Sequence, residues 1–251
     1  MPSLTGRGGS PLSGRCLGRT SSPPVLWQGL ARTNPAFSIM RYPPDQKTRT
    51  RQLIVETASR VLRRDGIAAT GIVPLMRELG MTQGAFYKNF ADRDDLLVAA
   101  LTWASEETRG FMASWAAAAR ADGIAPIARI IEEYISKRHL DHPERGCLVA
   151  ALLGELWRHS SVVRRCAEEQ CLHLFDDVAS YLPTERREDG RALYLLMAGT
   201  ISSARLASDR ASQIATLSEG REAASRLIEM MSPPKDRAGS DGLSERDGSA
   251  R

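Results

Sequence analysis

Residues 70–90 read TGIVPLMRELGMTQGAFYKNF, and this stretch decides the fold. Its first part carries apolar residues at three- and four-residue steps, which predicts one face of a short helix: Ile72, Leu75, Met76 and Leu79. Gly80 ends that helix, because glycine accepts the left-handed backbone of a sharp exit. Pro74 fits only in the first turn, where no helical N–H bond is lost.

The second part predicts a helix of about two turns. The Thr82 hydroxyl can cap its start, and Ala85, Phe86 and Phe90 recur at the spacing of an inward face. The opposite face carries side chains suited to phosphates and base edges: Gln83, Gly84, Tyr87, Lys88 and Asn89. Two short helices joined by a glycine turn form a helix-turn-helix.

These residues resemble the DNA-binding domain of TetR-family transcriptional regulators. The resemblance covers roughly residues 47–97 and rests on Thr70, the Ile72–Leu75 pair, residues 79–87 and residues 90–97. It implies an all-α chain with a helix-turn-helix DNA-binding domain at 46–92 and a helical effector-binding and dimerisation domain at 93–231. It also implies a double-stranded DNA operator as partner and a cytoplasmic location.

The resemblance and the residue chemistry together give a set of DNA-contacting candidates. Gln83 would read base edges, and Gly84 and Ala85 would permit close approach. Phosphate contacts, an N-terminal basic arm and an adenine-reading amide complete the set: Thr82, Tyr87, Lys88, Thr70, Arg93, Lys47, Arg49 and Asn89. Thr70 is predicted to cap the first helix of the motif. A solvated helix face and a solvated basic turn are the plainer alternatives.

The charge of the chain is concentrated at its beginning. The net charge is +4, yet residues 1–51 hold eight basic side chains and one acid, Asp45. A basic front end suits an anionic partner. Residues 1–45 and 232–251 are rich in Gly, Ser, Pro and charge, which predicts disorder. Met40 is an alternative start, just before the recognisable domain. No run of about 18 apolar residues predicts a membrane span.

Helical periodicity extends through the rest of the chain, and no alternating run predicts a strand. The first helix is expected at 46–65 and ends at Gly66. Asp92 is placed to cap a long helix at 93–119. The remaining helices are expected at 126–140, 146–158, 161–182, 185–208 and 217–231.

An effector pocket between these helices needs an apolar wall with a few polar anchors. The candidates are Trp103, Trp115, Tyr134, Cys147, Ala151, Glu155, Cys171 and Phe175. Each is also typical of ordinary core packing. Glu155, in an apolar run, needs a partner or a cationic ligand if it is buried, or else faces solvent.

Four cysteines raise a further possibility, because Cys147 lies near a helix start that can lower a thiol pKa. A thiol-redox-responsive regulator is therefore an alternative function. The four histidines do not share a helical face suited to a metal, so no metal or other cofactor is expected. No nucleophile elbow, phosphate loop or dinucleotide fingerprint points to an enzyme.

The last two helices carry small and aliphatic residues on one face: Leu193, Leu196, Met197, Thr200, Ala204, Ala224, Leu227 and Ile228. In TetR-like proteins such helices pair with their symmetry mates, so this set is the expected homodimer interface. The alternative is an intramolecular hairpin. The resulting prediction is a ligand-responsive repressor that binds a palindromic operator as a dimer. A ligand-independent regulator of the same fold is the other alternative.

Overall fold

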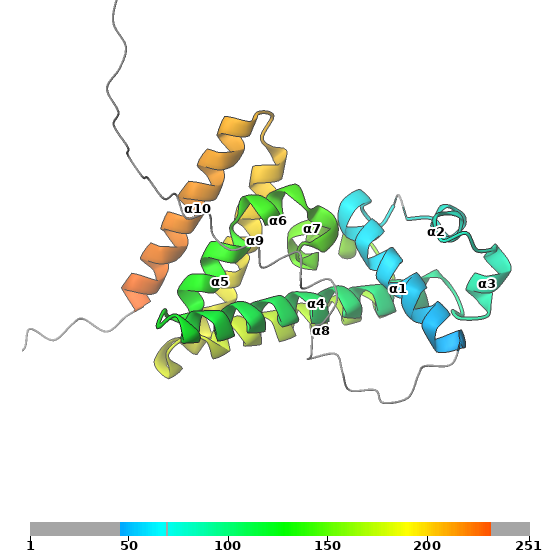
Figure 1. Ribbon diagram of the computed structural model, residues 1–251, viewed down its shortest axis with the longest axis horizontal. Coiled ribbons are helices and arrows are strands. Elements are labelled where there is room, and N and C mark those ends of the chain that lie inside the picture. Colours follow the sequence, from blue (N-terminus) through cyan, green and yellow to red (C-terminus); the bar gives the residue numbers. More distant parts are fainter. Residues whose placement is uncertain (1–45, 69, 232–251) are drawn as a thin grey trace, which may run out of the picture. The chain divides into compact units, whose positions relative to one another are not determined.

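The computed structural model describes residues 46–68 and 70–231, which belong to one compact unit (Figure 1). The expectations for residues 1–45 and 232–251 lie outside these ranges. Every regular element of the described residues is helical, which confirms the all-α prediction. The elements are α1 Gln46–Asp65, α2 Ile72–Glu78, α3 Gln83–Tyr87, α4 Arg93–Ala121, α5 Pro126–Tyr134, α6 Lys137–Asp141, η2 Pro143–Arg145, α7 Leu148–Leu156, α8 Ser161–Ser180, η3 Thr184–Asp189, α9 Gly190–Leu206 and α10 Arg210–Met231.

Local signals in the sequence set several of these boundaries. Gly66, Gly80 and Gly123 adopt φ values of 85°, 66° and 69°, so glycine ends or follows α1, α2 and α4. The Asp92 carboxylate accepts a hydrogen bond from the Asp95 N–H and caps α4, as predicted. Pro74 lies in the first turn of α2, where its missing N–H costs no bond.

Three predicted boundaries are wrong. The helix expected at 185–208 is divided, because its first residues form η3 and α9 begins only at Gly190. The helix expected at 126–140 is divided, because Ile135 leaves helical geometry and the Ser136 side chain caps a new helix at the His139 N–H. The last helix begins at Arg210 rather than 217. Asp209 accepts from the Ser212 N–H at 2.9 Å and stabilises that earlier start.

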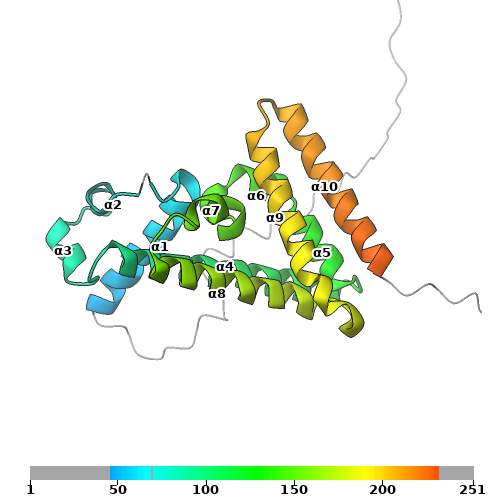
Figure 2. The same cartoon turned by 180° about the vertical axis from the view of Figure 1, so that it is seen from behind.

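The body is built on two long helices. α4 and α8 lie side by side and run in the same direction (Figures 1 and 2), with Thr102 beside Cys166 and Arg109 paired with Asp177. α9 and α10 form a hairpin at one end, α1–α3 lie at the other, and α7 contacts both α9 and α1. None of the described helices is long and apolar enough to cross a membrane.

Half of the residues expected at the dimer interface are instead packed inside the α9–α10 hairpin. Four of its members are completely buried within the chain and offer no surface to a second copy: Leu193, Met197, Ala204 and Ala224. Leu196, Thr200, Leu227 and Ile228 are partly buried. The helical spacing identified an apolar face correctly, but the covering partner for these four residues is the same chain.

The two helices of the hairpin are tightly packed where Gly220 meets Thr200. A Cβ placed at Gly220 would lie 2.2 Å from Thr200 Cγ2 and 2.4 Å from Thr200 Oγ1. The Thr200 hydroxyl donates to the Leu196 carbonyl at 2.8 Å, which holds the side chain in place. Glycine therefore permits the two helices to approach this closely.

We expect the Gly220→Ala variant to be less stable by about 1–3 kcal/mol, because the added methyl group overpacks the α9–α10 contact. Denaturant unfolding at a fixed protein concentration measures the effect. Gly110→Ala on α4 is the matched control, since nothing lies within 4 Å of its Cβ position. The control should gain about 0.5–1 kcal/mol from helix propensity. Equal stability changes in both variants would contradict the close-contact explanation.

Candidate nucleic-acid interface

The helix-turn-helix is held by two buried aromatic rings. Phe86 and Phe90 are 0% and 2% exposed, and their ring centroids lie 5.3 Å apart. The Thr82 hydroxyl accepts from the Ala85 N–H at 3.3 Å, which confirms the predicted cap of α3. A helix of five residues is too short to persist alone. Packing and capping therefore hold α3 in place.

The outer face of α3 is polar and open to solvent. Gln83, Gly84, Tyr87 and Lys88 are exposed, and the Tyr87 side chain is 57% exposed. Lys47 and Arg49 are exposed on the first turn of α1, so they form a basic helix start rather than an extended arm. DNA contact by these residues stays a prediction.

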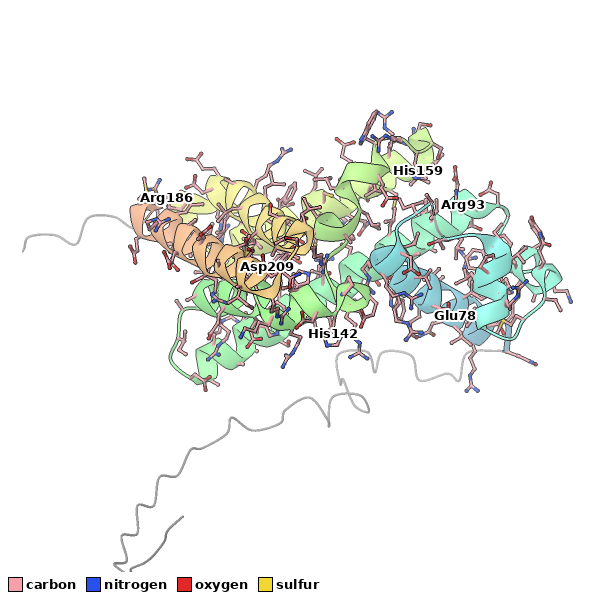
Figure 3. All side chains as sticks on the ribbon, turned by 90° about the horizontal axis from the view of Figure 1, so that it is seen from above. Glu78, Arg93, His142, His159, Arg186 and Asp209 are labelled. Carbon is pink, nitrogen blue, oxygen red and sulfur yellow. The ribbon has the colours of Figure 1, made fainter. Side chains whose placement is uncertain are left out.

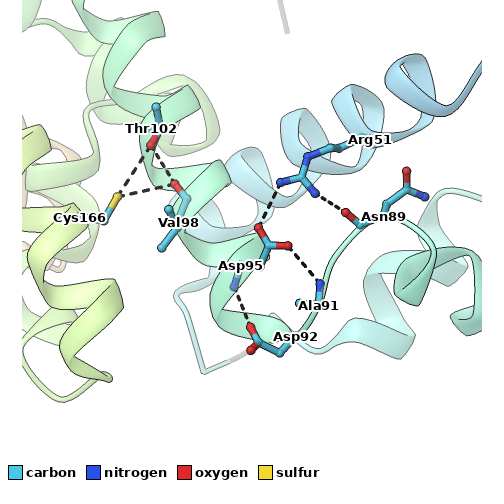
Figure 4. A network of polar contacts seen from close by, with 8 residues as sticks. All are labelled: Arg51, Asn89, Ala91, Asp92, Asp95, Val98, Thr102 and Cys166. Atoms are coloured by element: carbon cyan, nitrogen blue, oxygen red, sulfur yellow. Dashed lines mark hydrogen bonds and ion pairs between the residues drawn. The ribbon is translucent and has the colours of Figure 1, made fainter. Parts of the chain in front are cut away.

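A polar network fixes the end of α3 against α1 and α4 (Figure 4). The Arg51 guanidinium donates to the Asn89 carbonyl and to Asp95 Oδ1, the latter at 3.1 Å. It also lies 4.1 Å from the centroid of the Phe90 ring. Asp95 Oδ2 accepts from the Ala91 N–H at 3.1 Å. Arg51 therefore has a structural role inside the motif.

Thr70 and Arg93 both face the chain itself. Thr70 is 4% exposed and its hydroxyl donates to the Gly66 carbonyl at 2.9 Å. The residue before α2 is Gly71, without a side-chain cap, so the predicted Thr70 cap is wrong. The Arg93 guanidinium donates to the Ile67 and Thr70 carbonyls and braces the α1–α2 connection. Figure 3 labels Arg93 among the side chains of the described residues. A phosphate contact by either residue stays a prediction.

Asn89 also differs from its expected role. It is half-buried, and its Nδ2 donates to the Ala85 carbonyl at 2.8 Å, across the last turn of α3. Its buried Oδ1 has no hydrogen-bond partner within the described chain. The amide therefore closes the helix end, and base reading by Asn89 stays a prediction.

Four of the effector candidates lie in one buried group of the body. Cys147 Sγ lies 2.8 Å from the Tyr194 hydroxyl, and the Tyr194 ring packs edge-on against Tyr134 and Phe175 at 5.7 and 5.5 Å. Cys171, on α8 beside Phe175, is also buried. We call Tyr134, Cys147, Phe175, Tyr194 and His139 the buried aromatic cluster.

The protonation states of the cluster follow from burial. Desolvation raises the pKa of Tyr134 and Tyr194 well above 10, so both hydroxyls stay neutral. Burial lowers the pKa of His139 to about 4. His139 Nε2 accepts from the Cys147 N–H at 3.0 Å, which fixes its Nδ1–H as donor to the Tyr134 carbonyl.

The other effector candidates lie elsewhere. Trp103 and Trp115 are half-buried on α4, where Trp115 stacks on Phe111. Ala151 lines a surface groove of about 370 Å³ between α7 and α9. Glu155 has an internal partner, since its Oε2 accepts from the Ile67 N–H at 2.9 Å. Glu155 therefore binds the α1–α2 connection and needs no cationic ligand.

Sequence reasoning missed three residues of this region. Tyr194 lies in an apolar run of α9 that is typical of ordinary core packing, and His139 was considered only as a metal ligand. Arg205 donates to the His139 carbonyl at 2.8 Å, a partner 66 residues away. The only signal for Arg205 in the sequence was a basic residue in the last turn of a helix. Within the described residues, no group of three His, Cys, Asp or Glu side chains is arranged for a metal.

Comparison with known proteins agrees with this geometry. Residues 54–100 match the family described as bacterial regulatory proteins, tetR family. No curated protein matches the chain significantly. A TetR-family transcriptional regulator from Cytophaga hutchinsonii is 18% identical, with a TM-score of 0.59 over 73% of this chain and 97% of that one. A TetR-family transcriptional regulator from Streptomyces coelicolor is 23% identical, with a TM-score of 0.55 over 72% and 96%.

A third solved structure, a TetR-family transcriptional regulator from Agrobacterium tumefaciens, is 16% identical, with a TM-score of 0.57 over 70% of this chain and 98% of that chain. Residues 54–100 therefore match the tetR family of bacterial regulatory proteins, and the described chain shares its fold with these solved TetR-family transcriptional regulators. The match is to regulatory proteins and not to an enzyme family.

We expect Lys88→Ala to weaken DNA binding at every sequence and to lower the salt dependence. The slope of log affinity against log salt should fall by about 0.9, the value for one lost phosphate contact. Fluorescence anisotropy across a salt series measures it. Lys137→Ala, an exposed lysine on α6, is the control and should keep the wild-type slope. An unchanged slope in Lys88→Ala would exclude that contact.

We expect the partly buried His139 to make stability depend on pH. The pKa of His139 is 6.5 in the unfolded chain and about 4 in the folded chain. Its contribution to the free energy of unfolding is therefore fully present above pH 6.5. Stability should fall by about 1.4 kcal/mol per pH unit between these values, and no further below pH 4. Urea unfolding across this window measures it.

The His139→Gln variant should remove that slope, because the glutamine amide does not titrate. His142→Gln is the matched control, since the His142 side chain is 57% exposed. A wild-type slope that survives in His139→Gln would assign the pH dependence to other groups.

Proposed function

We propose that the protein is a transcriptional repressor that binds a palindromic double-stranded DNA operator as a homodimer and is released by a small-molecule effector. The observation that carries the proposal is the exposed polar face of α3, held by the buried Phe86 and Phe90 and fixed through Arg51. This is the geometry of a recognition helix prepared for the major groove. Such a protein acts in the bacterial cytoplasm, where the DNA is.

An apolar surface on α7 and α9 supports the homodimer. Leu153, Trp157, Leu195 and Leu206 are 48%, 63%, 39% and 86% exposed. The groove between these helices is lined by small and apolar residues, among them Gly154, Ala198 and Gly199. Exposed apolar patches of this kind are typical of protein–protein contacts. We assign the symmetric contact to this face, in place of the buried residues of the α9–α10 hairpin.

The buried aromatic cluster supports the effector. It brings aromatic rings together with a thiol and two neutral hydroxyls inside the helical body. The Tyr134 hydroxyl is buried and makes no hydrogen bond of ordinary geometry within the described residues. A ligand that offers an acceptor could satisfy it. Release then requires that the ligand binds the DNA-incompetent state better than the DNA-binding state.

Selection of DNA from a random library with the purified protein tests the proposal, together with the mass of the protein and of its DNA complex. We expect enrichment of a palindrome and a complex that holds two chains. Leu206→Glu on the exposed face of α9 should shift the mass toward one chain and weaken operator binding. Leu172→Glu, an exposed leucine on α8, is the control and should leave both unchanged.

Selection of a site without two-fold symmetry, bound by one chain, would overturn the dimeric part of the proposal. No enrichment at all would overturn sequence-specific binding by the free protein.

A further inference from the structure

Arginines from three helices donate hydrogen bonds to one short segment of the body. The segment comprises residues 135–147, which contain α6, η2 and the residue before α7, and we call it the bridge segment. Arg63 of α1 donates to the Gly146 carbonyl at 2.9 Å, and Arg205 of α9 donates to the His139 carbonyl at 2.8 Å. Arg221 of α10 donates to the Ile135 carbonyl at 2.9 Å.

The α1 contact is fixed by burial and by a hydrogen bond from each nitrogen of the Arg63 guanidinium. The Arg63 side chain is 1% exposed. Its Nε donates to the Ser59 carbonyl at 3.1 Å, and its Nη2 donates to Glu107 Oε2 at 2.6 Å. A planar guanidinium with all three nitrogens bonded has one orientation. Arg63 therefore joins α1, α4 and the bridge segment at a defined position.

Gly146 is the point where the contacts of α1 and α9 converge. A Cβ at this residue would lie 2.8 Å from the His139 ring and 3.1 Å from Arg205 Nη2. The next residue, Cys147, donates its N–H to His139 Nε2 at 3.0 Å. Because a packed interior transmits displacement instead of absorbing it, a shift of Arg205 is passed on to Gly146 and from there to Arg63.

A second link joins α7 to the α1–α2 connection. Glu155, near the end of α7, accepts from the Ile67 N–H at 2.9 Å. Its Oε1 would lie 2.7 Å from a Cβ at Gly66, so the residue that ends α1 lies directly against this carboxylate. The bridge segment and α7 thus hold the DNA-binding domain at two separate points.

We propose that Arg63 and Arg205 are positioning residues that set the spacing of the two operator half-sites. Through the bridge segment they fix the orientation of α1, and with it α3, relative to the α9 face that pairs in the dimer. The inference rests on the proposed function, since two half-sites require a dimer. A dimer reads half-sites about one helical turn apart, so a rotation of each DNA-binding domain changes the spacing that fits.

The test measures affinity for a series of operators whose half-sites are moved together or apart by single base pairs. We expect a sharp optimum for the wild-type protein. Arg63→Gln and Arg205→Gln should flatten it, with the ratio between the best and worst spacing falling about tenfold. Affinity for DNA in which one half-site is scrambled should stay unchanged, because neither residue lies on the outer face of α3.

Arg64→Gln is the matched control. Arg64 is the neighbour of Arg63 on α1, is 49% exposed and pairs with Asp65. It should keep the wild-type spacing profile. Circular dichroism and unfolding curves establish that each variant is folded. If Arg63→Gln does not fold, Arg205→Gln decides the outcome.

The outcomes separate this inference from the proposed function. A flattened profile in the arginine variants, with Arg64→Gln unchanged, supports the inference. A wild-type optimum that persists in every folded arginine variant overturns it and leaves the dimeric repressor intact. A wild-type protein that selects no palindrome overturns both.

Discussion

The structure depends on one buried cation, the guanidinium of Arg63. Removing a charge from water costs several kcal/mol unless the charged group finds an opposite charge and hydrogen-bond partners. Arg63 meets that condition with the Ser59 carbonyl on its own helix, Glu107 on α4 and the Gly146 carbonyl. These three acceptors lie on separate parts of the chain. Satisfying the charge therefore fixes how α1 lies against α4 and against the residues that precede α7.

The groups of the bridge segment that lie near the Arg63 guanidinium are neutral: the Gly146 carbonyl accepts from it, and the His139 ring is uncharged. His139 acts as an acceptor toward Cys147 only while its ring is unprotonated, and burial beside Arg205 and Arg63 keeps it so. Burial also raises the pKa of Cys171 to about 12 and that of Cys166 above its usual value. These two thiols are therefore protonated at neutral pH, which disfavours them as oxidant sensors. A satisfied polar network of this kind specifies one arrangement of the core.

Sequence reasoning succeeded where the cause of a structure is local. Gly80, Thr82 and Asp92 act within four residues of themselves, and each ends or caps a helix as predicted. It failed where a partner lies far along the chain. Glu155 binds Ile67 and Arg205 binds His139, contacts that span 88 and 66 residues.

The apolar faces of α9 and α10 also show that sequence patterns do not identify distant partners. Helical periodicity identifies which residues of α9 and α10 avoid water, and the structure agrees that these faces are covered. It does not identify the covering partner. Leu193 and Met197 are covered by the same chain, whereas Leu195 and Leu206 on α9 stay exposed. The small Gly220, which permits the intramolecular contact, was a signal for the hairpin.

Two of the arginines of α1, Arg51 and Arg63, explain why a change in the body reaches the recognition helix. Arg51 ties the first half of α1 to Asn89 and Asp95 at the α3–α4 junction, and Arg63 ties its last turn to Gly146. At 1.5 Å per residue these attachments are about 18 Å apart along one uninterrupted helix. A helix held firmly at both points cannot absorb a displacement by bending locally. A movement of Gly146 therefore displaces the α3–α4 junction, and with it α3, whose outer face carries the predicted DNA-contacting residues.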